Sequence, residues 1–230
     1  MVQPGDVISY LEMCREEGVN LQRGMNFHLH GEFSVILMSL RKGAPYADRV
    51  EDGGRVLIYE GHDLPKRSAA QYPKIIDQPM TNPTGTLTQN GLFYRAAMKY
   101  KSGSGQSEFV RVYEKIHSGI WAYNGLFKLV DAWQEESGAR RVFKFKLEAV
   151  DNIEISTIEQ KEIDHTRLIP ASIKLEVWSR DKGQCVICGS KDNLHFDHII
   201  PYSRGGSSLL AENVQLLCAR HNLAKRNRIE

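Results

Sequence analysis

The spacing of apolar residues changes along the chain, and each change predicts a different kind of element. Near the N-terminus, Val7, Ile8 and Leu11 recur close to helical spacing and Gly18 follows them, which predicts a helix over residues 6 to 23. From Gly24 onward, short apolar or alternating runs are separated by Gly, Pro and Asn, which predicts strands. The predicted strands are Phe33–Leu40, Arg55–Tyr59, Phe109–Ile116, Leu126–Trp133 and Val142–Val150.

The last of these runs has the clearest strand pattern. Phe143, Phe145 and Leu147 alternate with charged residues, the period of two that is typical of a half-buried strand. Several short strands at this spacing indicate a β-rich sandwich or barrel. Loops at 41–54, 61–90 and 102–107 separate them, and the second contains four of the eight prolines. Such a long loop is usually functional or partly disordered, and we favour a function.

The C-terminal third has a different pattern. Residues 148 to 169 lack a clear period, which indicates a linker. Pro170 fits the first turn of a helix that runs to about Arg180, with Ile173, Val177 and Trp178 on one face. Beyond it, residues 194–200 are typical of a strand that ends at Pro201, and residues 216–225 are typical of a helix.

Composition and charge narrow the class of protein. A length of 230 residues with 41% apolar residues allows two modest domains or one large domain. The chain has no run of eighteen apolar residues and no N-terminal signal pattern, so we expect a soluble, cytoplasmic protein without a membrane partner. The net charge of +2 says little about partners, but residues 220 to 229 contain no acid. That basic end suits either phosphates or a solvated helix terminus.

Three of the four cysteines gather near the C-terminus. Cys185 and Cys188 form one pair, and Cys218 with His221 forms a second pair about thirty residues later. This spacing is typical of a structural Zn²⁺ site, and it makes a disulfide framework unnecessary. Four protein ligands leave no position for water, so this metal would hold a scaffold. Cys14 stands alone and is expected to be a buried or incidental thiol.

Polar residues with a different chemistry lie between and beside the zinc pairs. They are Asp197, His198, Asn213 and Asn222. Hydrolysis of a phosphodiester needs a nucleophile formed near neutral pH and stabilisation of the charge on the phosphate. Histidine titrates in that range, and a carboxylate with an amide oxygen can hold one hard cation. The alternative is that Asp197 and His198 only support the zinc; His195 we interpret as structural.

Over residues 170 to 228, the spacing of these residues resembles the ββα-metal fold of the HNH endonucleases. The resemblance implies that Asp197 and Asn222 hold one catalytic divalent cation such as Mg²⁺ or Mn²⁺. Asn222 stands where the family has its last histidine. His198 would be the general base and Asn213 would orient the histidine loop.

Six short stretches between Gly24 and Val150 form a second ordered set. They are 33–39, 46–54, 59–61, 78–82, 110–112 and 123–129, the last followed by Trp133. In their order and spacing they resemble the SRA or YDG domains, which bind modified cytosine. The resemblance implies a pocket for an extruded base, in which Tyr46 and Tyr59 sandwich the ring and Asp48 accepts from its exocyclic amine. The alternative makes Tyr46 a loop residue and Tyr59 a core aromatic.

Four basic residues are candidates for contact with DNA. Lys66 and Arg67 lie in the long loop and could grip phosphates or fill the space left by the base, or form a solvated turn. Lys225 and Arg226 belong to the basic C-terminal run.

Together the patterns predict an α+β fold in four parts: an N-terminal helical brace (1–23), a β-rich SRA-like barrel (24–150), a linker (151–169) and a small zinc-bound HNH domain (170–230). The two resemblances imply an endonuclease that cuts double-stranded DNA near 5-methylcytosine or 5-hydroxymethylcytosine. A double-strand break needs two HNH sites, so we expect a homodimer or transient pairing of two copies on the DNA. The alternatives are a non-catalytic reader of modified DNA with a purely structural zinc module, and a nuclease for unmodified DNA or RNA.

Overall fold

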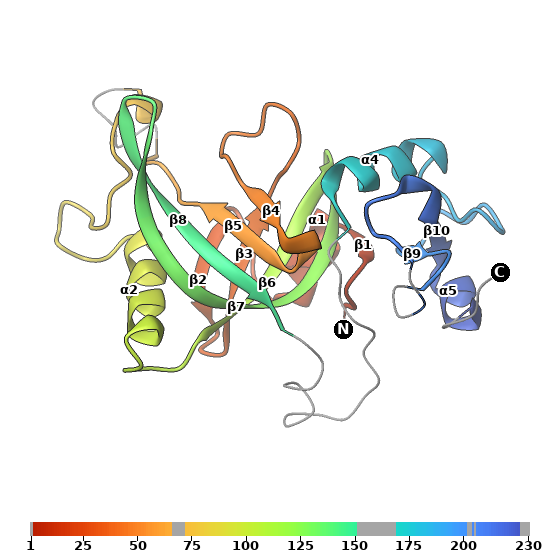
Figure 1. The fold of residues 1–230 in the computed structure, drawn as a ribbon, viewed down its shortest axis with the longest axis horizontal. Coiled ribbons are helices and arrows are strands. Elements are labelled where there is room, and N and C mark those ends of the chain that lie inside the picture. The colour runs from red at the N-terminus through yellow and green to blue at the C-terminus, as the bar shows by residue number, and fades with distance from the viewer. Residues whose placement is uncertain (1, 66–71, 151–168, 202–203, 205, 226–230) are drawn as a thin grey trace.

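The computed structural model describes residues 2–65, 72–150, 169–201, 204 and 206–225 (Figure 1). Its strands form one mixed ten-stranded sheet along the path β10-β9-β1-β7-β6-β3-β2, and β8, β5 and β4 continue from β7. The strands are β1 Asp6–Ser9, β2 Met25–Leu29, β3 Phe33–Met38, β4 Arg49–Glu51, β5 Val56–Glu60, β6 Glu108–His117, β7 Ile120–Ser137, β8 Arg140–Ala149, β9 Leu194–His198 and β10 Val214–Cys218.

Within the described ranges, four α-helices accompany the sheet: α1 Tyr10–Glu16, α2 Gln89–Lys101, α4 Ala171–Arg180 and α5 Ala219–Lys225. Short 3-10 turns occur at η1 Asp52–Gly54, η2 Pro73–Ile75 and η4 Ala211–Asn213. None of the helices in the described ranges is long and apolar enough to cross a membrane. The fold is therefore sheet-rich with few helices, as the sequence predicts.

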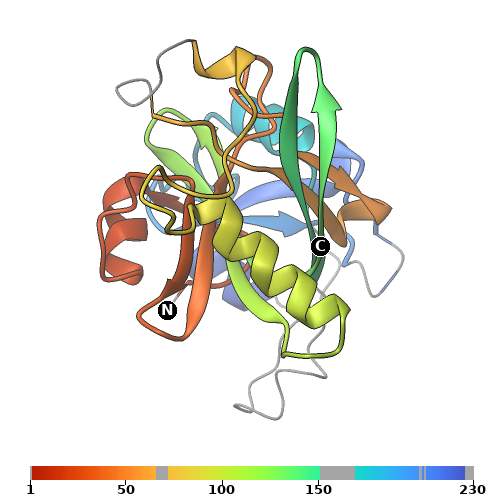
Figure 2. The ribbon, with the colours of Figure 1, turned by 90° about the vertical axis from the view of Figure 1, so that its left-hand side faces the viewer.

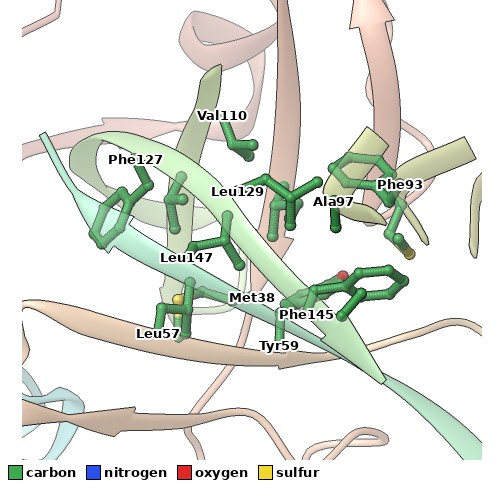
Figure 3. Packing of buried hydrophobic residues seen from close by; sticks show 14 of the residues in the cluster. Met38, Leu57, Tyr59, Phe93, Ala97, Val110, Phe127, Leu129, Phe145 and Leu147 are labelled. Atoms are coloured by element: carbon green, nitrogen blue, oxygen red, sulfur yellow. The ribbon is translucent and has the colours of Figure 1, made fainter. Parts of the chain in front are cut away.

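The long strand β7 organises the N-terminal domain. It forms an antiparallel hairpin with β8, and the two curve together around the main core (Figures 1 and 2). Phe143, Phe145 and Leu147 of β8 are buried in that core, which confirms the face predicted from their alternation. Helix α2 closes the core with Phe93 and Ala97, which lie four residues apart on one helix face (Figure 3).

Helix α2 was not predicted from the sequence. Thr88 caps its N-terminus by accepting a hydrogen bond from Gly91 N at 3.2 Å. Asn90-Gly91, which is typical of a turn, here lies in the first turn of the helix. A Cβ at Gly91 would come within 2.2 Å of Met80 O, so the preceding loop can pass only over a glycine.

The predicted helix over residues 6 to 23 is wrong for its first part, because Asp6–Ser9 is strand β1. Ser9 and Glu12 form a capping box: Ser9 N donates to the Glu12 carboxylate at 2.7 Å, and Glu12 N donates to Ser9 Oγ at 3.2 Å. Because a capping box fixes where a helix starts, α1 begins at Tyr10. It ends at Glu16, shortly before Gly18, whose φ is +65°.

Strand β1 joins the N-terminal domain to the C-terminal module. Val7 pairs with Ala122 of β7 on one side and with Leu194 of β9 on the other. A second core spans the junction and contains Ile116 and Ala122 together with Phe196 and Leu216. The two parts therefore share a sheet and a core. Apart from Ile169, the predicted linker lies outside the described residues.

A buried ion pair crosses the same junction. Lys174 of α4 donates to Glu114 Oε2 and to Asn124 Oδ1, both at 2.6 Å. Asn124 Nδ2 also donates to Glu114 Oε2, at 3.0 Å. The Lys174 and Glu114 side chains are 2% and 0% exposed. A charge in such a position is tolerated only with its partner, so helix α4 is held to β6 and β7 by this contact.

We predict that Lys174→Met lowers the free energy of unfolding by about 3–5 kcal/mol, because it leaves the Glu114 carboxylate buried without a counter-ion. Lys146→Met is the matched control, since Lys146 pairs with Glu148 at 2.8 Å but is 37% exposed. The control should lose less than about 1 kcal/mol. Denaturant unfolding measures both, and equal losses would contradict the assigned role of Lys174.

Candidate functional site

Four side chains of the C-terminal module form a cluster with the geometry of a zinc site. The ligand atoms of Cys185, Cys188, Cys218 and His221 all lie within 4.8 Å of one another. Cys188 Sγ and Cys218 Sγ are 3.8 Å apart, and His221 Nδ1 lies 3.4 Å from Cys185 Sγ and 3.3 Å from Cys218 Sγ. Tetrahedral Zn²⁺ with bonds of about 2.3 Å to sulfur separates two sulfurs by about 3.8 Å. The residues therefore fit the predicted metal.

Local structure brings the four ligands together. Cys185 and Cys188 lie on a tight turn in which Gly189 N donates to Cys185 O at 2.8 Å. Cys218 is the last residue of β10. Helix α5 starts at the following residue, Ala219, and His221 lies in its first turn. Burial raises the pKa of Cys185, but backbone N–H groups of Cys218, Cys188 and Ile187 lower it to about 6. The thiolate, which is the form that binds metal, is thus favoured at neutral pH.

Asp197 and His198 are the last two residues of strand β9, where His198 pairs with Val214 of β10. His198 Nε2 lies 2.9 Å from the Ser208 hydroxyl. Asp197 Oδ2 accepts from Lys225 Nζ at 2.5 Å and from Gln215 Nε2 at 3.5 Å. The Lys225 amine also donates to the backbone carbonyl of His198. Asp197 and His198 are thus each held by a contact from a neighbouring segment, and their catalytic roles stay a prediction.

Asn213 holds the loop that follows His198 by hydrogen bonds. Its Oδ1 accepts from Ile200 N at 2.8 Å, and its Nδ2 donates to Ile200 O and Ser207 O, both at 3.1 Å. A Cβ at Gly206 would come within 1.7 Å of Ile200 O, so the loop can close this tightly only at a glycine. Asn213 therefore lies where a residue that orients the histidine loop must lie, and its functional role stays a prediction.

Helix α5 contributes the remaining predicted residues. Asn222 lies three residues before Lys225 and therefore on the same side of the helix, the side that reaches Asp197. Lys225, which the sequence offered as a contact for DNA, is only 1% exposed and forms the ion pair with Asp197. Its amine therefore faces inward. The other candidates for DNA contact, Lys66, Arg67 and Arg226, lie outside the described residues.

In the N-terminal domain, a cavity of about 620 Å³ is lined by Tyr46 and Asp48. Tyr59 does not line it: the side chain belongs to the main core and is 1% exposed. Only the Tyr59 hydroxyl approaches the cavity wall, where it lies 3.2 Å from Gly24 O and 2.8 Å from His62 Nε2. The structure thus brings Tyr46 and Asp48 together at one cavity. Tyr59 is instead a core aromatic, as the alternative interpretation expected.

Asp48 is fixed by the backbone on both of its oxygens. Oδ1 accepts from Glu60 N at 2.9 Å, and Oδ2 accepts from Ser39 N at 3.2 Å. Burial raises the pKa of Asp48 from its ordinary value of 3.8 to about 7, although these hydrogen bonds lower it. Because a carboxylate oxygen has two lone pairs, each atom keeps one for an incoming donor.

The sequence analysis missed two groups around this cavity. His62 stacks on Tyr46, with ring centroids 4.7 Å apart and planes at 9°. Four cations, which are Arg23, Arg41, Lys42 and Lys115, line the same cavity as Asp48. The adjacent pair Arg41-Lys42 at the start of a glycine-rich loop was a usable signal for the cations. His62 had no signal, because only the fold brings it to Tyr46.

The chain was compared with protein families and known structures. Residues 1–153 match the family model described as SAD/SRA domain, and residues 185–228 match the model described as HNH endonuclease. No curated protein matches the chain.

Three solved structures are similar to this chain over 65% to 97% of its length. The first is a SUVH5 SRA complex with fully methylated CG DNA (25% identity, 65% of this chain, 90% of that chain, TM-score 0.44). The second is a SUVH5 SRA complex with hemi-methylated CG DNA (26% identity, 71% of this chain, 94% of that chain, TM-score 0.45). The third is the modification-dependent TagI restriction endonuclease (21% identity, 97% of this chain, 77% of that chain, TM-score 0.43).

We predict that the chain holds one zinc ion and that Cys218→Ser lowers the bound zinc well below one per chain. Loss of a thiolate ligand weakens a tetrahedral site and removes the folding energy that the metal supplies. Metal analysis of the purified protein, with a thermal unfolding scan, measures both effects. Cys14→Ser is the control, since Cys14 lies outside the cluster. Full zinc content in Cys218→Ser would reject the assignment.

We also predict that Asp48 makes stability fall as pH rises from about 4 to about 7. In that range the unfolded chain loses the Asp48 proton while the folded protein keeps it, because burial raises the pKa of Asp48 from 3.8 to about 7. Asp48→Asn removes this titration. The stability of the wild type relative to Asp48→Asn should therefore decline between these pH values, as measured by denaturant unfolding, and a constant or rising difference would contradict the assignment.

Proposed function

The chain belongs to the SAD/SRA domain family, and from this membership we propose that it is a DNA endonuclease that recognises a modified cytosine before it cuts. The observation that carries the proposal is the combination of two sites in one chain. Tyr46 and Asp48 line a cavity in the SAD/SRA part, and Asp197 with His198 lies in the part that matches the HNH endonuclease model.

Recognition begins with a base turned out of the duplex, which costs a few kcal/mol of stacking that the pocket must recover. Tyr46 offers an aromatic face for the base. Asp48 offers a carboxyl oxygen as acceptor to the exocyclic amine that distinguishes cytosine from thymine, and its backbone hydrogen bonds hold the carboxyl group in place. We assign 5-methylcytosine or 5-hydroxymethylcytosine as the target, with the substituent at C5 recognised by the shape of the cavity.

The cations around the cavity support binding of the DNA backbone. Arg41 and Lys42 are exposed, and Arg23 and Lys115 line the same cavity. Cationic side chains on this rim would neutralise phosphates on either side of the extruded nucleotide. They position the duplex and leave the choice of base to the pocket.

Cleavage is assigned to the C-terminal module. Lys225 and Gln215 bind Oδ2 of Asp197, so we assign Asp197 Oδ1, with the amide oxygen of Asn222, as the ligands of one Mg²⁺ or Mn²⁺ ion. Such an ion, when bound, stabilises negative charge on the phosphate and on the leaving oxygen.

The remaining residues of the module position and activate water. His198 takes the proton of the attacking water at one ring nitrogen, while the Ser208 hydroxyl contacts Nε2 at 2.9 Å. Asn213 keeps the following loop in place. One such site cuts one strand, so a double-strand break requires two copies of the chain on the DNA.

One observation favours a second candidate, a non-catalytic reader of modified DNA. The Asp197 carboxylate already has a cation partner in Lys225. A purely structural module would have this arrangement if no divalent cation ever entered. The two candidates differ in whether His198 acts on DNA.

The test is digestion of matched unmodified, 5-methylcytosine and 5-hydroxymethylcytosine duplexes with Mg²⁺, with Mn²⁺ or with a chelator. We expect cutting of modified DNA only, and none with the chelator. His198→Ala should keep its affinity for modified DNA and lose at least about 10²-fold in cutting rate. His117→Ala, at an exposed residue outside the module, is the control for removing an imidazole.

Three outcomes would change this assignment. Equal cutting of the three duplexes would reject modification dependence. Selective binding by the wild type without any cutting would favour the reader. Unchanged cutting by His198→Ala would remove that residue as the base.

A further inference from the structure

Three aromatic rings meet at the wall of the base cavity, and His62 is the ring that contacts both tyrosines. The His62 imidazole is stacked on Tyr46 with centroids 4.7 Å apart, and it lies 6.0 Å from the Tyr59 ring at 40°. The Tyr59 hydroxyl lies 2.8 Å from His62 Nε2. Gly24 lies against the same imidazole: a Cβ there would come within 2.6 Å of Cε1. The histidine ring is therefore enclosed on several sides.

This stack leaves no room for a base on the same face of Tyr46. Aromatic carbons in contact are about 3.5 Å apart, so a base held between two rings needs about 7 Å between them. The Tyr46 and His62 centroids are 4.7 Å apart. Lys74 Nζ also lies over the Tyr46 ring, 4.1 Å from its centroid. A base can therefore stack on Tyr46 only if a side chain moves away.

The backbone at His62 cannot supply this movement. His62 N donates to Asn90 Oδ1 at 2.8 Å, and Asn90 Nδ2 donates to His62 O at 2.8 Å. Gly61 is held as well, because its N donates to Phe143 O at 2.9 Å and its O accepts from Gln78 Nε2 at 2.5 Å. Motion is thus confined to the side-chain torsions of His62.

A place for the displaced ring exists next to it. His62 lines the 620 Å³ cavity that contains Tyr46 and Asp48, and it also lines a second cavity of about 760 Å³ with Pro79 and Asn82. The imidazole forms part of the wall between the two. Burial lowers the pKa of His62 to about 4, so the ring that would move is neutral and carries no charge into either cavity.

We propose that the His62 imidazole occupies, in the DNA-free protein, the place on Tyr46 where the extruded cytosine stacks, and that it swings toward the second cavity when the base enters. The inference rests on the proposed function. Tyr46 exchanges its stack on His62 for a stack on the base, so its ring has a partner in both states. The free energy needed to break the His62 contacts makes binding of the base less favourable by the same amount.

The first test measures affinity. His62→Ala should bind a 5-methylcytosine duplex about tenfold more tightly than the wild type, since no ring stack and no Tyr59 hydrogen bond must be broken. Tyr100→Ala, an exposed ring on α2, is the control for loss of an aromatic side chain and should bind as the wild type does. Weaker binding by folded His62→Ala would show that the imidazole holds the base, and would overturn the proposal.

The second test follows the His62 ring of the intact protein by NMR, and it does not depend on how His62→Ala folds. In the free protein, the carbon-bound protons of His62 should be shifted upfield by the Tyr46 ring, and Tyr46→Leu should abolish that shift. A saturating 5-methylcytosine duplex should abolish it as well. An unchanged His62 signal in a complex that discriminates against unmodified DNA would overturn the displacement and leave the proposed function intact. Equal affinity for modified and unmodified duplexes would reject the proposed function itself.

Discussion

The rest of the structure depends on strand β1, which forms backbone hydrogen bonds with both halves of the protein. Trp121, which lines the base cavity, pairs with Ile8 on this strand. The neighbouring Val7 pairs with Leu194, the first residue of the strand that ends at His198. A path of backbone pairs therefore runs from the proposed recognition cavity to the proposed cleavage site. The distance between the two is set by a β-sheet, which deforms far less readily than a polar linker, and the Lys174–Glu114 ion pair holds the same junction.

Buried ion pairs also fix the residues proposed to act on DNA. Glu60 is bound by Lys144 at 2.9 Å, and its Oε2 accepts from Ala47 N at 3.1 Å, between Tyr46 and Asp48. The Glu60 backbone N–H in turn donates to Asp48. A buried pair of this kind contributes little net stability but strongly penalises any arrangement that separates the charges. The Glu60 network thus specifies the conformation of the loop that carries the pocket residues.

Sequence patterns predicted the parts of this protein that depend on local spacing. The Cys/His cluster that could bind zinc and the buried face of β8 were predicted because their signals are short and regularly spaced. Strand β1 and the stack of His62 on Tyr46 were missed, since each depends on a partner far away in the chain. Tyr59 shows the same limit. Its strand was predicted to within one residue at each end, but the direction of its side chain follows from packing against residues that no local pattern identifies.

The cavity at Tyr46 and the site at Asp197 have one physical feature in common. This feature explains why the contacts of both residues were hard to predict from the sequence. A half-buried carboxylate without a bound cation needs a counter-charge from the protein. A partly buried aromatic ring without a bound base needs a side chain packed against its face. Lys225 meets the first need at Asp197, and His62 meets the second at Tyr46. Both partners come from the chain itself, so the DNA-free fold is stable without its ligands. Under the proposed function, DNA and metal would compete with contacts that already exist, and the selectivity of each site would depend on how much better the incoming group satisfies the same atoms.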